Sequence, residues 1–547
     1  MDYKLCILAA GKNERVSYAE DFPIAILPIG TSSALSRIIN KFPRELEIII
    51  AVGYKSELVK DFIRIAYPDR KIKIVEISFW DAPGSGPGKS LLLCKNYLQC
   101  PFIFTSADTI VADAIPEPSK NWVGVSQISD SSHYCVADSE NGFVTKLYDK
   151  IDTPSLLKVC KNYKTILNNA FIGMAGIFDY ETFWNGLERN QEIEKEEMQV
   201  SNGLSELIAQ KIETFTFFNW FDVGSEAGYN LANRFFEKNA VIAKPDEFLY
   251  FEGGKVIKYF REKEIVKQRV ERSLKLRGIV PELVDVAPNF YSYNFIEGKT
   301  LAKVNDVAMF RELLDYAGET VWKEKKLSDD DFENFRLLCK KAYYNKTMGR
   351  VEKMHREQGI KDVEEIINGE KVPKLSTLLS EINWDGIFSG VPVTFHGDFQ
   401  PENILICDKG FQLIDWRHNF ADSVEHGDIY YDFAKLHHAL IVTHDVIRKN
   451  QFEIKENNGV ISYDFFLKSN LVEYKDLFEK FVVSAGYDLD KLKIVSALTF
   501  INIAPLHHTP YNKFLYYLGK YSLYKELKRQ KEYKAIESTK IENPLEN

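Results

Sequence analysis

The stretch Leu5-Cys6-Ile7-Leu8-Ala9-Ala10-Gly11-Lys12-Asn13-Glu14-Arg15 decides the fold of the first half of the chain. An apolar run of strand length ends in a small, glycine-containing turn, and polar residues follow at once. Similar runs alternate with amphipathic stretches, which predicts a mostly parallel sheet with helices on both faces. Such sheets bind ligands at the carboxyl ends of their strands. The later runs are EIIIAV (47–52), KIKIVEI (71–77), PFIFTS (101–106) and WVGVSQI (122–128), and the amphipathic stretches are 34–41, 55–66 and 89–98.

The pattern changes near residue 240, where β-hairpins follow a helical stretch. Gly253-Gly254 is typical of a tight hairpin turn, and a charged helix is expected to about Arg277. Long helical segments dominate after Gly298, apart from a strand-rich stretch between Val391 and Trp416. We therefore predict an α/β first domain and an α+β second domain. The expected bounds are 1–238 and 239–547, with a small β-rich lobe at about 239–298 and a large helical lobe at about 299–547; hairpin strands are expected at 241–244, 248–251 and 255–260.

Composition narrows the class of protein. The chain has 547 residues, and its 70 Lys and Arg against 79 Asp and Glu give a net charge of −9, so we expect no nucleic-acid partner. Seven cysteines without a CxxC pair favour a reducing, cytoplasmic compartment. The sequence has neither a signal-peptide pattern nor an apolar stretch of about 18 residues, so we expect no membrane insertion. Small molecules are the expected partners, and a homo-oligomer stays open.

Polar residues follow three of the expected strands in the first domain. Gly11 would let backbone N–H groups approach phosphate oxygens, and Arg15 could bind those oxygens bidentately. Asp108 follows the strand PFIFTS, and Asp222 lies in the later segment WFDVG. Two carboxylates facing a phosphate-binding turn suit a Mg²⁺ ion that bridges a triphosphate. The simpler alternative for Asp222 is an N-cap of the helix that follows it.

The order of these segments resembles the nucleotidyltransferase family, which joins sugar phosphates or phosphocholine to a nucleoside triphosphate. That family carries a LAAGxGxR turn, a PKxLxP segment, a Gly-rich loop, an Asp after a central strand and a late DVG-type Asp. The resemblance covers roughly residues 1–238 and implies a Rossmann-like domain. It implies nucleotide binding by Ala9, Ala10, Gly11, Gly84, Gly86 and Gly88, catalysis by Arg15, Mg²⁺ binding by Asp108 and Asp222, and contacts from Lys150 and Asn169 to a phosphorylated substrate.

Two positions depart from the family pattern. Asn13 replaces the second glycine of the turn, and asparagine tolerates the left-handed conformation that glycine would supply. Ile24 replaces the lysine that usually follows the proline at this point, which removes a cation expected near the phosphates. Either Lys12 or another base substitutes, or this half is slow or degenerate.

The glycine-rich segment 83–90 is not a Walker A motif. That motif needs GxxxxGK[ST], but the residue five positions before Gly88 is Pro83. The resemblance gives this loop a simpler role, in which its glycines let the backbone approach the edge of a nucleotide base.

The second domain contains HGDFQPENILI at residues 396–406, followed by FQLIDW at 411–416. Protein kinases place a catalytic Asp five residues before a Mg²⁺-binding Asn, with a second Mg²⁺-binding Asp beyond the next hairpin. Asp398, Asn403 and Asp415 keep that arrangement. Asp398 would accept the proton of a substrate hydroxyl, while Asn403 and Asp415 would hold the metal ions that bridge the ATP phosphates.

HGDxxPxN followed by IDW resembles the aminoglycoside phosphotransferase and choline kinase family, whose members phosphorylate small molecules. The resemblance implies a protein-kinase-like fold and a strand lysine, for which Lys258 is preferred over its neighbours Lys255 and Lys263. Either Glu271 or Glu264 would be its ion-pair partner. The segment that resembles the nucleotide-binding hinge contains Phe295 and Glu297.

Arg417 follows Asp415-Trp416, where choline kinases usually carry an acidic residue. A cation at this point argues against choline and favours an anionic or polyhydroxylated substrate, with Arg417 as a substrate-binding residue. The arginine could instead pair with Asp428 or Asp432 in the segment HGDIYYDFAKL.

Together the two halves predict sequential chemistry in one chain. The second domain would use ATP and Mg²⁺ to phosphorylate a small alcohol, and the first would couple that phosphate to a second nucleoside triphosphate, with CTP preferred. The product would be an activated precursor for a surface polysaccharide or lipid. Alternatives are a sugar 1-kinase joined to a UTP- or GTP-dependent transferase, an active kinase with a degenerate nucleotide-sensing first domain, and a non-catalytic nucleotide-binding scaffold.

Overall fold

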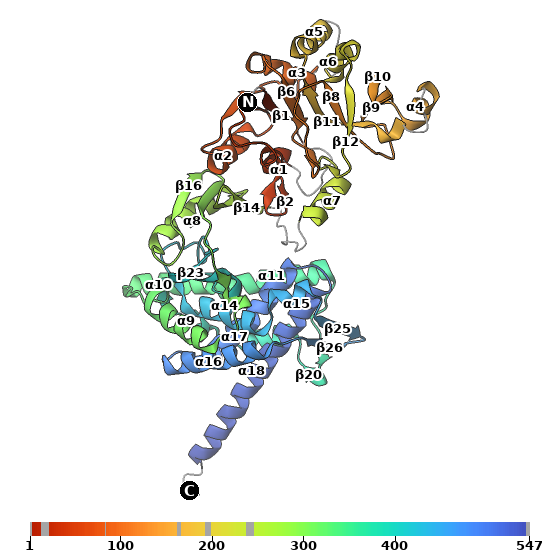
Figure 1. Ribbon diagram of the computed structural model, residues 1–547. Coiled ribbons are helices and arrows are strands. Elements are labelled where there is room, and N and C mark those ends of the chain that lie inside the picture. The colour runs from red at the N-terminus through yellow and green to blue at the C-terminus, as the bar shows by residue number, and fades with distance from the viewer. Residues whose placement is uncertain are drawn as a thin grey trace. The chain divides into compact units, whose positions relative to one another are not determined.

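The computed structural model describes residues 3–12, 21–82, 84–160, 166–191, 198–236 and 246–542 (Figure 1). The chain forms two compact units: unit 1 comprises Met1–Lys263 and Val284–Phe295, and unit 2 comprises Glu264–Leu283 and Ile296–Asn547. The expected domain boundary near residue 239 and the expected strand at 241–244 lie outside the described residues, so both stay predictions.

Unit 1 is built on a nine-stranded sheet with the order β5-β4-β1-β6-β11-β8-β12-β10-β9 (Figure 1). All five apolar runs of the first half form strands of this sheet, as predicted. The strands are β1 (Lys4–Ala9), β4 (Ile48–Val52), β5 (Ile72–Glu76), β6 (Phe102–Ser106), β8 (Trp122–Ser126), β9 (Cys135–Glu140), β10 (Phe143–Asp149), β11 (Ala170–Ile177) and β12 (Glu213–Thr216).

The sheet is mixed, which corrects the expectation of a mostly parallel one. β5, β4, β1 and β6 are parallel neighbours, but β11 runs antiparallel to both β6 and β8. β9 and β10 form an antiparallel hairpin whose turn is Asn141-Gly142, with φ of 53° and 82°. An Asn-Gly pair is the typical sequence of such a turn, because both positions need positive φ. The predicted parallel pattern therefore holds for β1, β4, β5 and β6, and β8 and β12 form one further parallel pair.

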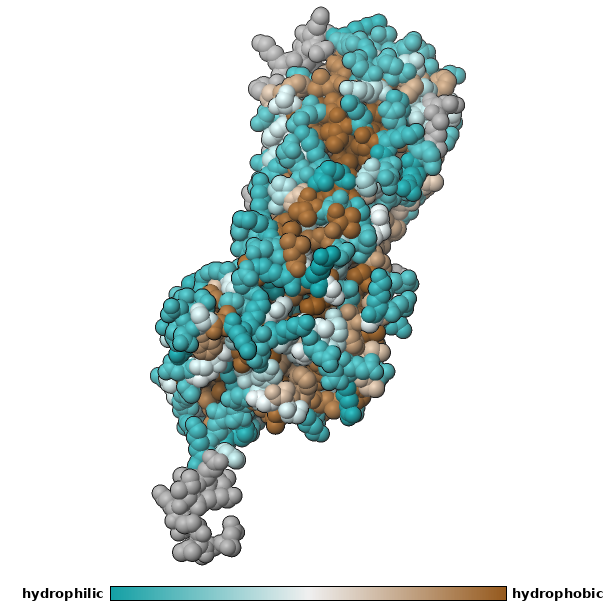
Figure 2. Space-filling view, turned by 90° about the vertical axis from the view of Figure 1, so that its left-hand side faces the viewer, coloured by the Kyte–Doolittle hydropathy of each residue, from teal (hydrophilic) through white to brown (hydrophobic). Residues whose placement is uncertain are grey.

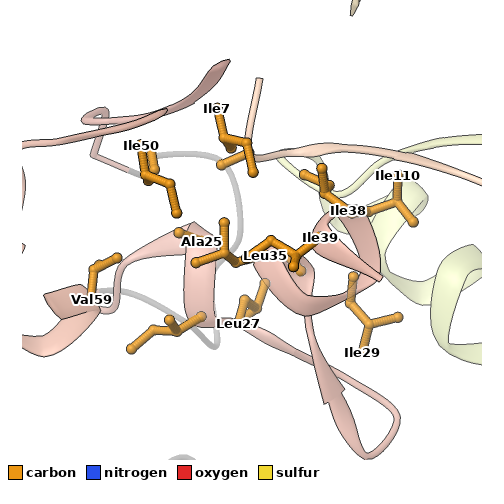
Figure 3. Packing of buried hydrophobic residues seen from close by; sticks show 14 of the residues in the cluster. Ile7, Ala25, Leu27, Ile29, Leu35, Ile38, Ile39, Ile50, Val59 and Ile110 are labelled. Atoms are coloured by element: carbon orange, nitrogen blue, oxygen red, sulfur yellow. The ribbon is translucent and has the colours of Figure 1, made fainter. Parts of the chain in front are cut away.

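Both faces of this sheet are buried. Along β1, Leu5, Ile7 and Ala9 join one hydrophobic cluster and Cys6 and Leu8 join another, because alternate side chains of a strand point to opposite faces. Figure 3 shows part of the first cluster, in which Ile7 and Ile50 of the sheet lie opposite Ala25, Leu35 and Ile38. The helices of unit 1 are α1 (Ala34–Ile39), α2 (Ser56–Ala66), α3 (Pro87–Leu93), α4 (Thr153–Val159), α5 (Tyr180–Gln191), α6 (Ser201–Glu206) and α7 (Glu226–Phe236).

A four-stranded antiparallel sheet, ordered β14-β15-β17-β16, shares the first of these clusters. Its first hairpin turns at Gly253-Gly254, where φ is 58° and 72°, as the sequence predicts. Tyr250 donates a hydrogen bond to the carbonyl of Ile26 at 2.7 Å, and Phe248 packs against Phe22. These contacts explain why the strands group with unit 1. Their bounds are β14 (Glu247–Glu252), β15 (Lys255–Phe260), β16 (Leu283–Ala287) and β17 (Phe290–Asn294).

Unit 2 is mainly helical, as expected for the large lobe of the second domain (Figure 1). A three-stranded sheet, β18-β22-β23, carries the hairpin that follows the HGD segment. The helices are α8 (Lys263–Lys275), α9 (Val307–Thr320), α10 (Asp329–Lys340), α11 (Lys346–Gln358), α12 (Leu375–Ser380), α13 (Trp384–Phe388), α14 (Ile429–Ile441), α15 (His444–Arg448), α16 (Ser469–Ser484), α17 (Leu489–Ile503) and α18 (Tyr511–Glu542). The strands are β18 (Lys299–Thr300), β19 (Glu365–Ile367), β20 (Glu370–Val372), β21 (Pro392–Val393), β22 (Ile404–Cys407), β23 (Gly410–Leu413), β24 (Gly427–Asp428), β25 (Phe452–Asn457) and β26 (Val460–Phe465).

The surface mixes polar and apolar side chains. Figure 2 shows patches of hydrophobic residues between hydrophilic ones on the face that it presents. Over the described ranges, no helix combines the length and the apolar character needed to span a bilayer.

Candidate active sites

The first candidate site begins at the turn after β1. Ala9 and Ala10 are buried, while Gly11 and Lys12 are exposed. The carbonyl of Ala10 accepts a hydrogen bond from the backbone N–H of Tyr54 at 2.9 Å, which ties the turn to the loop after β4. A Cβ added at Gly11 would meet no atom of the described residues within 4 Å. The turn therefore presents an unobstructed backbone, while Asn13 and Arg15 lie outside the described residues.

Asp108 and Asp222 lie beside each other although the sequence separates them widely. β7 (Thr109–Val111) pairs with β13 (Trp220–Asp222), so that Thr109 lies opposite Asp222. The backbone N–H of Val223 donates to the carbonyl of Asp108 at 3.0 Å. Ala107 is the residue before Asp108. Its backbone N–H donates to the carbonyl of Leu8 in β1, also at 3.0 Å. The backbones of Asp108 and Asp222 are thus adjacent, and the residue before Asp108 is bonded to β1, which leads into the Gly11 turn. Metal binding by the two carboxylates stays a prediction.

The carboxylate of Asp222 is held by two hydrogen bonds. Tyr134 donates to its Oδ2 at 2.8 Å, and the backbone N–H of Gly224 donates to its Oδ1 at 3.1 Å. The N-cap of α7 is Ser225, whose Oγ accepts from the backbone N–H of Gly228 at 3.2 Å. The simpler alternative for Asp222, an N-cap of this helix, is therefore wrong, because the hydroxyl of Ser225 fills that role.

Of the two residues expected to contact a phosphorylated substrate, Lys150 is bonded to Tyr134 and Asn169 is bonded to Ser139. Lys150 is exposed, has a positive φ of 46°, and donates its backbone N–H to the carbonyl of Tyr134 at 3.1 Å. Asn169 donates from Nδ2 to the hydroxyl of Ser139 at 2.9 Å. Tyr134 therefore connects Asp222 to the Lys150 turn. Sequence reasoning missed Tyr134, since no motif of the first domain contains it.

The glycine-rich loop leads into α3. Gly84 has a φ of 75°, and Gly86 directly precedes the helix. Gly88 donates its backbone N–H to the carbonyl of Met198 at 2.9 Å, and a Cβ at this position would lie 2.7 Å from the carbonyl oxygen of Gln199. Gly88 is therefore required for close packing inside unit 1. Contact of this loop with a nucleotide base stays a prediction.

Ile24 lies in a short 3-10 helix, Ile24–Ile26, and is partly buried against the hydrophobic cluster of unit 1. Its apolar side chain therefore contributes to packing. Lys12 lies nearer the turn, with its Nζ 6.0 Å from the ring centroid of Tyr54. Lys55 is also near this ring but forms an ion pair with Asp21 at 2.7 Å. Lys12 is thus the better candidate for the cation that the family pattern places at residue 24.

The second candidate site lies in unit 2, around Asp398. Its Oδ1 lies 2.9 Å from the Nζ of Lys435 on α14. Asn403 donates from Nδ2 to both the Oδ2 and the backbone carbonyl of Asp398, each at 3.0 Å, and Gln400 donates to Oδ2 at 3.2 Å. Burial acts to raise the pKa of Asp398, but the positive charges of Lys435 and Arg417 lower it to about 2. Asp398 is therefore a carboxylate, and so a proton acceptor, at neutral pH.

Asp415 follows the hairpin formed by β22 and β23. Its φ is 58°, and its Oδ1 lies 2.8 Å from a guanidinium nitrogen of Arg269 on α8. The backbone N–H of Ile414 donates to the carbonyl of Asn403 at 2.9 Å, which brings Asp415 next to Asn403. Carboxylate and amide oxygens are the donors that Mg²⁺ prefers. The two residues therefore fit the metal-binding role expected of them.

The backbone of the HGD segment is held from within unit 2. Asp432 accepts hydrogen bonds from the backbone N–H groups of His396 at 2.7 Å and Gly397 at 2.6 Å. Gly397 has a φ of 89°, and a Cβ there would lie 2.5 Å from that of Arg417, so only glycine fits. Burial lowers the pKa of His396 to about 4, which keeps its ring neutral. Asp432 is thus a structural support of the loop.

The remaining residues that the sequence predicts for the second site belong to different units. In unit 1, Lys258 is buried on β15, 3.8 Å from Glu247, and Phe295 is exposed and packs against Phe251. In unit 2, Glu271 forms an ion pair with Lys275 at 3.1 Å. Lys258 as the ATP-binding lysine and its pairing with Glu271 stay predictions. In unit 2, Glu264 pairs with Lys267 at 3.8 Å, and Glu297 is exposed.

Throughout the described part of the chain, no group of three or more His, Cys, Asp or Glu side chains could hold a metal ion. Each candidate site instead contains two residues with oxygen-donor side chains whose backbones are close together: Asp108 with Asp222, and Asn403 with Asp415. Such pairs suit Mg²⁺ that takes its other ligands from phosphates and water, which is the usual arrangement for this ion.

Comparisons with known proteins concern the first part of the chain. It is 28% identical over 244 residues to the Bifunctional protein GlmU of Methanococcus aeolicus, a match of 43% of this chain and 54% of the relative. The GlmU of Methanococcus vannielii is 27% identical over 242 residues, again 43% of this chain and 55% of the relative. The chain thus spans about half the length of the curated relatives it matches. No protein-family model matches the sequence.

Two solved structures are also similar. The CTP:phosphocholine cytidylyltransferase of Streptococcus pneumoniae has a TM-score of 0.35 and 14% identity, covering 43% of this chain and all of that one. The inositol-1-phosphate CTP transferase of T. maritima has a TM-score of 0.33 and 15% identity, covering 44% of this chain and 98% of that one. The first part of the chain is thus similar in sequence to GlmU proteins.

Proposed function

We propose that the protein is a bifunctional enzyme that phosphorylates a small hydroxylated metabolite with ATP and then couples the new phosphate to a second nucleoside triphosphate. The observation that carries the nucleotidyl step is the backbone adjacency of Asp108 and Asp222, with the residue before Asp108 bonded to β1, in a region similar in sequence to GlmU. The Asp398 network supports the phosphoryl step.

In the phosphoryl step, Asp398 accepts the proton of the acceptor hydroxyl as its oxygen bonds to the γ-phosphorus of ATP and ADP leaves. In a loose transition state the proton moves late, so the position of Asp398 matters more than its basicity. The low pKa of Asp398 suits such a transition state. Asn403 and Lys435 hold the two carboxylate oxygens in place. A Mg²⁺ ion held by Asn403 and Asp415 would neutralise charge on the phosphates.

In the nucleotidyl step, a phosphate oxygen of the first product attacks the α-phosphorus of the second nucleotide, and pyrophosphate leaves. The backbone at Gly11 and the side chains of Arg15 and Lys12 would bind the triphosphate. Asp108 and Asp222 would hold a second Mg²⁺ ion that offsets the phosphate charge. We favour CTP as this nucleotide because the fusion order resembles bacterial choline-activating enzymes; a sugar 1-phosphate with UTP or GTP is the alternative.

One observation favours a second candidate function. Ile24 is part of the hydrophobic packing and supplies no cation. If no other residue replaces that charge, unit 1 would bind a nucleotide without turning it over, and the enzyme would be a kinase with a nucleotide sensor.

A substrate screen separates these functions. The full chain is incubated with Mg²⁺, ATP, one of CTP, UTP, GTP and dTTP, and a panel of small alcohols, amino alcohols, sugars and hydroxy acids, and ADP and pyrophosphate are measured separately. We expect ADP with one class of acceptor, followed by pyrophosphate with one nucleotide. ADP without pyrophosphate for every nucleotide would support the sensor, and neither product would contradict both functions.

A further inference from the structure

A cavity of about 80 Å³ in unit 2 has a strongly cationic lining. Lys346 and Arg350 reach it from α11, Lys435 from α14, and Arg417 from the segment after Asp415. A π-helical turn, Lys341–Asn345, precedes α11 and contributes two further lining residues. Such turns occur often at functional sites.

The positive charge of this cavity is not balanced by carboxylates at contact distance. Only Lys435 has one, Asp398, among the residues that the structure describes; no carboxylate there lies within 4.0 Å of Lys346, Arg350 or Arg417. Four cations facing one carboxylate leave an excess of positive charge. An excess of this kind, partly removed from water, attracts an anion.

The contacts and the pKa of Tyr431 reflect this positive charge. Lys346 donates to its hydroxyl at 3.3 Å and lies 5.3 Å from the ring centroid. Burial acts to raise the pKa of Tyr431, but Arg417, Lys346 and Lys435 together lower it to about 7. The cations thus already stabilise a negative charge at this place.

Asn502 on α17 gives an independent indication of a ligand. Its side chain is 8% exposed and lines the same cavity. Nδ2 donates to the hydroxyl of Thr347 at 3.1 Å, but Oδ1 has no hydrogen-bond partner among the described residues. Buried acceptors are normally satisfied, because leaving one without a donor is costly. A hydroxyl group in the cavity would supply that donor.

Lys435 connects the cavity to Asp398, which does not itself line it. Oδ1 of Asp398 contacts Lys435, which lines the cavity, whereas Oδ2 contacts Asn403, the expected metal ligand. A molecule in the cavity would therefore lie next to Lys435, the residue that is paired with Asp398.

We infer that this cavity binds the carboxylate or phosphate group of a hydroxylated acid, and that this acid is the acceptor for phosphoryl transfer. The inference rests on the proposed kinase function of unit 2. Lys346, Arg350 and Arg417 bind the anionic group, and Asn502 accepts a hydrogen bond from a hydroxyl that does not react. The reacting hydroxyl gives its proton to Asp398, its oxygen bonds to the γ-phosphorus of ATP, and the bond from that phosphorus to the β–γ bridging oxygen breaks as ADP leaves.

Binding is tested by calorimetry on the full chain with glycerol, glycerate, glycerol 3-phosphate and inorganic phosphate. We expect the three anions to bind and glycerol not to bind. Arg350→Gln should weaken anion binding about 10- to 100-fold, the usual loss for one charge-assisted contact. Arg356→Gln is the matched control on the same helix, since Arg356 is 65% exposed and does not line the cavity. Equal binding by both variants, or binding of glycerol as tight as that of glycerate, would overturn the inference.

Turnover separates this inference from the proposed function. ADP release is measured with glycerol, glycerate, glycerol 3-phosphate and choline. We expect glycerate and glycerol 3-phosphate to be preferred over the other two. Comparing these two acids shows whether the site uses a carboxylate or a phosphate. Arg350→Gln should raise KM for the preferred acid with little change in kcat, and Lys346→Gln serves if Arg350→Gln does not fold. Preference for choline or glycerol would overturn the inference while the kinase stands. Arg350-dependent anion binding with no ADP from any acceptor would contradict the kinase and leave the anion site standing.

Discussion

The Nζ of Lys435 lies 2.9 Å from the Oδ1 of Asp398, so the expected catalytic carboxylate is paired with a lysine from a different element. Lys435 belongs to α14, most of whose other side chains are buried. A charged residue on such a helix usually has a partner, because an isolated buried charge is costly. The ion pair keeps Asp398 ionised and orients it.

Lys435→Gln should reduce phosphoryl transfer and move the acid limb of its pH profile. Lys435 is the foremost of the charges that hold the pKa of Asp398 near 2, so the variant's pKa rises. Activity then falls at a higher pH as the solution is acidified. We expect kcat to drop about 10- to 100-fold, as for loss of a positioned charge. The control is Lys449→Gln, an exposed lysine, and an unmoved acid limb in Lys435→Gln would contradict this role.

The two reactions should be separable by single substitutions. Asp398→Ala is expected to abolish ADP formation but to leave pyrophosphate release from a pre-phosphorylated substrate intact, and Asp108→Ala should do the reverse. Each loss should reach about 1,000-fold or more, because each carboxylate acts on charge in the transition state. Loss of both activities in either variant, with folding retained by circular dichroism, would contradict two independent sites.

Lys12→Met should impair nucleotidyl transfer more than Lys55→Met. Both lysines lie near the ring of Tyr54, but Lys55 is already paired with Asp21. Loss of one phosphate-binding cation should raise KM for the nucleotide about 10-fold or more. Steady-state pyrophosphate release measures the difference. Equal KM values for the two variants would show that Lys12 does not replace the cation missing at Ile24.

Gly11→Ala tests whether a nucleotide approaches the turn after β1. A Cβ there would meet no atom of the described residues, so the melting temperature should not fall appreciably. If phosphates contact this backbone, the added methyl group should obstruct them and raise KM several-fold. Gly349→Ala is the control in unit 2, where a Cβ also has open space among the described residues. An unchanged KM in Gly11→Ala would exclude close contact at this position.

Stability should depend on the protonation of His396. Burial lowers its pKa from 6.5 to about 4, so the unfolded chain binds more protons between these values. The free energy of unfolding therefore falls as the pH drops from about 6.5 to 4, by about 3 kcal/mol from this residue. His396→Asn should remove that share of the pH dependence in urea unfolding curves, while His508→Asn, at an exposed position, should not. Identical pH dependence of wild type and His396→Asn would contradict the burial argument.

Local patterns in the sequence identified five of the nine strands of the large sheet, the Gly253-Gly254 hairpin and the spacing of Asp398, Asn403 and Asp415. These predictions succeed because strand periodicity, turn residues and a five-residue motif spacing each depend only on residues that are close together in the sequence. The Asn141-Gly142 pair is also a typical hairpin signal, and the prediction of a mostly parallel sheet did not include it.

The sequence by itself therefore determined five strands of the large sheet, the motif residues and the charge balance of this protein. Only the tertiary structure decided that the sheet is mixed, that Tyr134 holds Asp222, and that Lys435 and Arg269 pair with Asp398 and Asp415. It also gathered Lys346, Arg350 and Arg417 around one cavity. The residues that meet in these contacts lie far apart along the chain. Such contacts arise from the packing of whole helices and strands, which no local pattern encodes.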